Sequence, residues 1–145
     1  MAGPHFSAIA AALLATAVGA CAGALPQHTG ISPRPECAGF SALLYFEPDS
    51  ADLLPAGTPI LRDVMSRVEA CRAAGGELSR MTITAFPDRS GGRQEARSEI
   101  DARARTARTA LVEAGAPRSA ILIQRPTDLD GQLMQRRAEI AIEMW

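Results

Sequence analysis

Apolar and polar positions alternate in recognisable patterns from about residue 40 onward. Residues 41–46 form a short apolar run with two aromatics, and the turn formers at 47–50 follow it, as expected of a strand entering a turn. Apolar residues then recur at helical spacing from Ile60 to Val68, until Gly75 and the glycine after it end the pattern. A strand followed by a helix is therefore predicted.

The second half of the domain repeats this order. Residues 78–85 alternate as a strand, and Pro87 with the glycines that follow predicts a loop over 86–93. An alanine-rich and arginine-rich helix is predicted over 94–114, followed by strands at 120–123 and 137–145. The order strand, helix, strand, helix, strand, strand predicts an α+β two-layer sandwich. Its helices pack on one face of a mixed four-stranded sheet.

The N-terminal region has a different character. Residues 6–20 carry no charge and are too few to span a membrane, which is typical of an export signal. Residues 21–39 contain three prolines and no hydrophobic periodicity, as in an extended linker. We therefore expect a signal peptide at 1–20, a flexible linker at 21–39 and one folded domain at 40–145.

Cys21 follows Val18, Gly19 and Ala20 in a run that resembles the lipobox of bacterial lipoproteins. In such proteins the cysteine becomes the lipidated N-terminus, so Cys21 is a candidate membrane anchor. The alternative is an ordinary cleavage site ending at Ala24, which would discard Cys21 and leave a soluble periplasmic protein.

Composition argues against several classes of function. Both histidines, His5 and His28, precede the domain, so it has no imidazole for general base catalysis or metal binding. The three cysteines show no C-x-x-C spacing, and the net charge of −1 gives no pull toward nucleic acid. We expect no metal, no cofactor, no enzymatic activity and no nucleic-acid partner.

Cys37 and Cys71 are candidates for a disulfide. A helix that runs back antiparallel to its preceding strand brings its end, with Cys71, near the chain entering that strand, with Cys37. The periplasm permits such a bond. Two free, partly buried thiols are the alternative that the sequence leaves open.

Several motifs with specific spacing resemble OmpA-like domains, the modules that bind peptidoglycan non-covalently in bacterial envelopes. The resemblance covers nearly the whole chain after the linker. It rests on Tyr45-Phe46-x3-Ser50-x2-Leu53-x3-Gly57-x3-Leu61, on residues 81–88, on Arg103-Ala104, on Leu111-Val112-x2-Gly115-x-Pro117 and on residues 135–140.

The resemblance implies a ligand and two residues that bind it. A loop aspartate and a helix arginine of the family hold the diaminopimelate of the peptidoglycan stem peptide, and Asp88 and Arg103 match them in position and in their fifteen-residue separation. A one-residue slip in the alignment would leave Arg105 competing for the role of Arg103, and Arg137 is a further candidate contact. The alternatives are that Asp88 only forms a turn and that Arg103 is a solvated helix residue.

The sequence departs from the family in the surroundings of this pair. The family has Gly-His-Thr before the aspartate, whereas this chain has Ala85-Phe86-Pro87, and Pro87 has no N–H to donate. Ala96 replaces a family asparagine, and Glu99-Ile100 replaces the family's Leu-Ser before the arginine, so the polar floor of the site is altered.

Two functions follow from the resemblance. The first is a non-enzymatic peptidoglycan-binding protein of the cell envelope, an outer-membrane lipoprotein facing the periplasm. The alternative is an OmpA-fold module that binds an envelope protein partner and has lost peptidoglycan binding.

Overall fold

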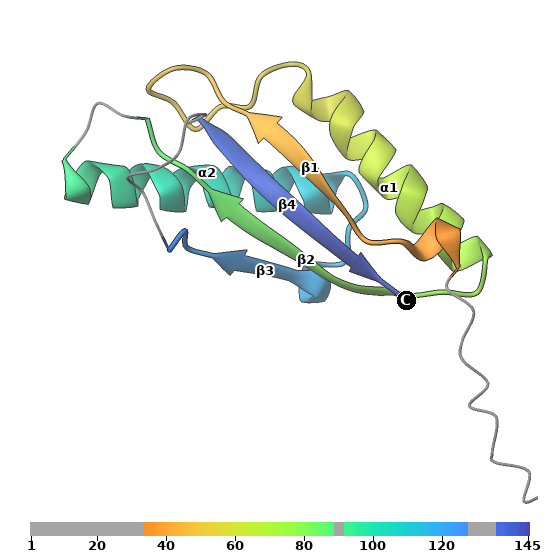
Figure 1. Ribbon diagram of the computed structural model, residues 1–145. Helices are drawn as coiled ribbons and strands as arrows, with labels where there is room; N and C mark the ends of the chain where they lie inside the picture. Colours follow the sequence, from red (N-terminus) through yellow and green to blue (C-terminus); the bar gives the residue numbers. More distant parts are fainter. Residues whose placement is uncertain (1–33, 89–91, 128–135) are drawn as a thin grey trace, which may run out of the picture. The chain divides into compact units, whose positions relative to one another are not determined.

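The structure, a computed structural model, describes residues 34–88, 92–127 and 136–145 (Figure 1). The predicted signal peptide and Cys21 lie outside the described residues. The elements in chain order are η1 (Pro35–Cys37), β1 (Phe40–Tyr45), α1 (Gly57–Ala73), β2 (Leu78–Ala85), α2 (Arg93–Glu113), η2 (Arg118–Ala120), β3 (Ile121–Gln124) and β4 (Arg137–Met144).

The sheet has the strand order β1-β4-β2-β3 (Figure 1). The last strand, β4, lies between β1 and β2 and is antiparallel to both, whereas β2 and β3 are parallel. Ile140 in β4 is paired with Ala42 on one side and with Ile83 on the other. The sheet is therefore mixed, and the predicted α+β fold class is confirmed.

Both helices turn an apolar face to the same side of the sheet. Leu61, Val64 and Val68 of α1 are buried at helical spacing, as are Ala104 and Leu111 of α2. They pack on the alternate residues of the strands that face them, Leu44, Met81, Ile83, Ala85, Ala138, Ile140 and Ile142. None of the described helices has the length and apolarity needed to cross a membrane.

Helices α1 and α2 have the same kind of C-terminal end, which explains why a glycine follows each of them in the sequence. Gly75 and Gly115 have φ angles of +79° and +106°, a left-handed conformation that favours glycine. The N–H of Gly75 donates to the Arg72 carbonyl, and the next N–H, of Gly76, donates to the Cys71 carbonyl. This is the hydrogen-bond pattern of a Schellman motif, which satisfies the last carbonyls of the helix.

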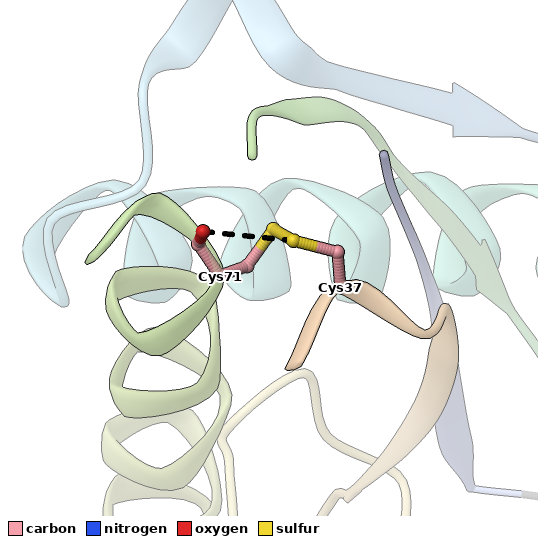
Figure 2. Close-up of a disulfide and its surroundings, with 2 residues drawn as sticks. All are labelled: Cys37 and Cys71. Carbon is pink, nitrogen blue, oxygen red and sulfur yellow. Dashed lines mark hydrogen bonds between the residues drawn. A yellow bond between two sulfur atoms is a disulfide. The ribbon is translucent and has the colours of Figure 1, made fainter. Parts of the chain in front are cut away.

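A disulfide joins Cys37 of η1 to Cys71 in the last turn of α1 (Figure 2). The two Cα atoms are 4.7 Å apart, within the range of unstrained disulfides. Both cysteines are buried, at 5% and 0% exposure. Closing a loop of this length stabilises the fold by about 3 to 4 kcal/mol in the chain-entropy estimate. The packed structure therefore starts before Phe40, inside the range predicted as linker.

Gly76 leaves the room that the disulfide needs. A Cβ atom on Gly76 would overlap Cys37 Sγ and would lie 2.6 Å from Cys71 Sγ and 2.7 Å from the Trp145 carbonyl oxygen. The first two of these atoms are fixed by the disulfide and the third is backbone. A side chain at this position must therefore displace the disulfide or the end of the chain.

We expect Gly76→Ala to lower the free energy of unfolding by about 1 to 3 kcal/mol, the usual cost of overpacking. The measurement is urea unfolding of the oxidised protein followed by circular dichroism. Gly57→Ala is the control, because its nearest new contact would be 3.6 Å, and we expect its stability to be unchanged or raised by up to about 1 kcal/mol. Equal stability of the two variants would contradict the crowding at Gly76.

Candidate functional site

The candidate site lies where β1 and β2 end and β4 begins. Because β4 is antiparallel to both neighbours, these three strand ends meet at one edge of the sheet. The N–H of Phe46 donates to the Arg136 carbonyl and the N–H of Phe86 donates to the Arg137 carbonyl, each at 2.9 Å. The segments that follow β1 and β2 are thus both held against the start of β4.

Arg103 of α2 lies between these two loops and is 0% exposed. Its Nε–H donates to the Ser50 carbonyl at 3.0 Å, and its Nη1 donates to the Phe86 carbonyl at 2.9 Å. Its guanidinium carbon lies 5.3 Å from the centre of the Phe46 ring. A single side chain therefore connects α2 with the segments after β1 and after β2.

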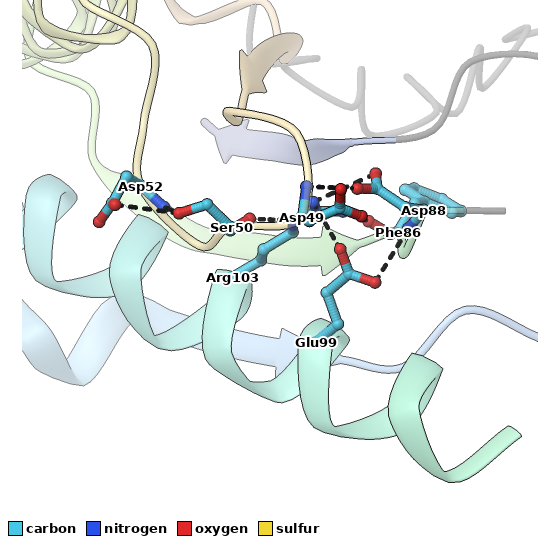
Figure 3. A network of polar contacts seen from close by, with 7 residues as sticks. All are labelled: Asp49, Ser50, Asp52, Phe86, Asp88, Glu99 and Arg103. Atoms are coloured by element: carbon cyan, nitrogen blue, oxygen red, sulfur yellow. Dashed lines mark hydrogen bonds and ion pairs between the residues drawn. The ribbon is translucent and has the colours of Figure 1, made fainter. Parts of the chain in front are cut away.

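Two carboxylates complete the surroundings of the guanidinium (Figure 3). Arg103 Nη2 lies 2.6 Å from Glu99 Oε1 and 3.2 Å from Asp88 Oδ1. The other oxygen of each carboxylate accepts a backbone hydrogen bond: Glu99 Oε2 from the Asp88 N–H at 3.0 Å, and Asp88 Oδ2 from the Asp49 N–H at 2.9 Å. Asp88 is therefore fixed through both its backbone and its side chain.

The two ion pairs are close contacts but not aligned hydrogen bonds. Asp88 Oδ1, Glu99 Oε1 and Arg103 Nη2 are all buried and have no hydrogen-bond partner with acceptable geometry. Their attraction is thus mainly coulombic.

The site carries more negative than positive charge. Arg103 contributes one positive charge, and Asp88 and Glu99 contribute two negative charges, which leaves the triad at −1. A groove beside it adds further acidic groups, and none of its described lining residues is basic. The lining consists of Asp49, Ser50, Ala51, Glu95, Ser98, Glu99 and Ala102. The electrostatics of this region favour a ligand with a positive charge.

The structure brings some predicted site residues together and separates others. Asp88 and Arg103 are in contact, and the alternative of Arg103 as a solvated helix residue is wrong because its side chain is fully buried. The guanidinium of Arg137 lies 4.3 Å from the centre of the Phe86 ring, next to the site. Arg105 is exposed and lines a different groove, with Thr58 among its neighbours.

Sequence reasoning noted Glu99 as a departure from the family but did not predict its ion pair with Arg103. Its position four residues before Arg103 is the spacing of an ion pair on one helix face, which was the available signal. Within the described part of the chain, no group of three or more His, Cys, Asp or Glu residues is arranged to hold a metal ion.

Comparison with known proteins identifies the fold. Neither a family model nor a curated protein sequence matches the chain. Solved structures do match. The peptidoglycan-associated lipoprotein from Burkholderia pseudomallei matches with a TM-score of 0.55 and 17% identity, over 70% of this chain and 89% of its own. The OmpA-like domain of FopA1 from Francisella tularensis matches with a TM-score of 0.54 and 14% identity, over 79% and 80%.

A third match is an outer membrane protein from Borrelia burgdorferi, with a TM-score of 0.55 and 19% identity, over 72% of this chain and 88% of its own. The domain therefore has the OmpA-like fold, and the resemblance seen in the sequence motifs is confirmed at the level of the fold. At these identities the comparisons establish the fold alone.

We expect Arg103→Ala to lower the free energy of unfolding by about 3 to 5 kcal/mol. The reason is that it leaves two partly buried carboxylates without their cation. Arg80→Ala is the matched control. Arg80 makes a bidentate contact with Glu143 on the open face of the sheet, where both side chains are about half exposed, so its loss should cost about 0 to 1 kcal/mol. Urea unfolding measures both variants, and a loss at Arg103 no larger than at Arg80 would contradict the role of the buried guanidinium.

Proposed function

We propose that this protein is a non-enzymatic component of the bacterial cell envelope that binds peptidoglycan through its OmpA-like domain. The observation that carries the proposal is the contact of Asp88 with the buried guanidinium of Arg103, 3.2 Å away, at the edge of a fold shared with a peptidoglycan-associated lipoprotein. The motif resemblance had assigned ligand binding to this same pair.

The chemistry of the pair suits diaminopimelate. The free end of this amino acid carries an ammonium group and a carboxylate on the same carbon, and an aspartate can accept hydrogen bonds from the ammonium. The Asp88 side chain is 12% exposed and can be reached from solvent, whereas that of Arg103 is 0% exposed. We therefore assign Asp88 as the residue that contacts the ligand first and Arg103 as the residue that positions it.

The location that fits this function is the periplasmic side of the envelope. The uncharged run at 6–20 supports export, and the lipobox-like run before Cys21 supports a lipid anchor in the outer membrane. Cleavage after Ala24 would instead release a soluble periplasmic protein with the same domain.

A second function is an interaction module for an envelope protein partner, in which the fold persists without peptidoglycan binding. One observation favours it. Glu99 already holds the Asp88 N–H and Arg103 Nη2, two donors that would otherwise serve a carboxylate of the ligand. Under this alternative the three residues form a structural network only.

Co-sedimentation with purified sacculi tests peptidoglycan binding. We expect the wild-type protein to pellet with sacculi. Asp88→Ala should bind about tenfold to a hundredfold more weakly, because a hydrogen bond to a charged group contributes about 1.5 to 3 kcal/mol. Asp101→Ala is the control, since Asp101 is a carboxylate on α2 whose partner is Arg125, and it should bind like the wild type.

Two results of this experiment would contradict the proposal in different ways. A wild-type protein that remains in the supernatant removes the peptidoglycan function and leaves the interaction module. Normal sedimentation of Asp88→Ala would agree with peptidoglycan binding but would show that the binding occurs at another site.

Mass spectrometry of the protein from its native membrane tests the anchor. We expect an N-terminal Cys21 with added acyl mass in the membrane fraction. An unmodified N-terminus at Leu25 would contradict lipidation and would support the soluble form.

A further inference from the structure

Glu99 takes the place that a ligand carboxylate would need. The donors nearest to a ligand carboxylate beside Asp88 are the guanidinium of Arg103 and the N–H of Asp88 itself. Glu99 Oε1 lies 2.6 Å from Arg103 Nη2, and Glu99 Oε2 accepts the Asp88 N–H at 3.0 Å. Two more donors of the guanidinium, on Nε and Nη1, are used by the Ser50 and Phe86 carbonyls.

The charge of the site opposes a second carboxylate. The one positive charge of Arg103 is already outnumbered by Asp88 and Glu99, and Glu95 and Asp49 line the adjoining groove. Like charges brought together in a partly desolvated site repel each other strongly. A ligand that carried a free carboxylate to this position would meet this repulsion, whereas an ammonium group would be attracted.

The carboxylate oxygens nearest the guanidinium are already paired with it. Asp88 Oδ1 and Glu99 Oε1 are buried and lie 3.2 and 2.6 Å from the same guanidinium nitrogen. The side chains of Asp88 and Glu99 are 12% and 22% exposed, whereas that of Arg103 is 0% exposed. A ligand therefore meets two carboxylates and no free cation, and a cationic group without a negative charge beside it suits them.

We propose that Glu99 determines the specificity of the site and selects stem peptides in which the carboxylate beside the free ammonium of diaminopimelate is amidated. This inference rests on the proposed peptidoglycan function. The ammonium group binds the carboxylate of Asp88, and the carboxamide brings no negative charge to Glu99. Amidation thus removes the charge that Glu99 would repel.

Two synthetic tripeptides test the proposal, each ending in diaminopimelate, one with the free carboxylate and one with the carboxamide at the centre that bears the free ammonium. Isothermal titration calorimetry with the mature protein gives both dissociation constants. We expect the wild type to bind the amidated peptide about tenfold or more tightly than the free acid. Glu99→Ala vacates the donors, so the free acid should then bind at least as tightly as the amide.

Two further variants serve as checks. Glu113→Ala removes a carboxylate from the exposed last turn of the same helix, outside the site, and should keep the preference of the wild type. Glu99→Gln keeps the size of the side chain and removes only its charge. It should therefore lose most of the preference while its circular dichroism spectrum stays that of the wild type.

The outcomes separate this inference from the function on which it rests. If the wild type binds the free acid as tightly as the amide or more tightly, the role of Glu99 is overturned and peptidoglycan binding stands. If neither peptide binds to the wild type or to Glu99→Ala, and sacculi do not retain the protein, the proposed function and the inference both fail.

Discussion

The buried guanidinium of Arg103 is the interaction on which this end of the domain depends. Its donors reach the Ser50 carbonyl in the loop after β1, the Phe86 carbonyl after β2 and the carboxylates of Asp88 and Glu99. Neither loop has regular structure along this stretch, so each relies on contacts with the rest of the domain. One side chain of α2 supplies those contacts for both loops.

A buried charged group is weak evidence that stability is its purpose, because a well-packed apolar group often serves as well or better. The network instead fixes the position of the Asp88 carboxylate. Asp88 is held through its N–H by Glu99, through one side-chain oxygen by the Asp49 N–H, and through the other by Arg103. A carboxylate fixed in this way is ready to receive a cationic group without reorganisation, which is the use that we propose for it.

The helices and strands of the sandwich were predictable because each has a clear local pattern. Strand β2 alternates from Arg80 to Ala85, and the glycines that follow α1 and α2 have the left-handed conformation. The pairing of Asp88 with Arg103 came from the family resemblance and not from local pattern. It could not have come from local pattern, because the contact joins a loop to a helix and depends on how α2 packs against the sheet.

The part played by Glu99 illustrates the limit of the sequence. A glutamate four residues before an arginine is common on exposed helix faces, where such a pair contributes little. Here the same spacing lies beneath two loops, so that the pair is desolvated and one carboxylate oxygen bonds the Asp88 N–H.

Topology alone placed Cys37 near Cys71. It did not show that Pro35–Cys37 belongs to the packed domain, because that depends on the disulfide, which the sequence left open.

Nuclear magnetic resonance of the arginine side chains tests the central claim most directly. With nitrogen-15 labelling, the Nε–H of Arg103 should give a resonance that exchanges slowly with solvent and is absent from Arg103→Lys, because this N–H is buried and bonded to the Ser50 carbonyl. Addition of the amidated stem peptide should shift that resonance in a saturable way. A resonance that exchanges rapidly, or that does not move while the peptide binds, would contradict the assignment of this network as the ligand site.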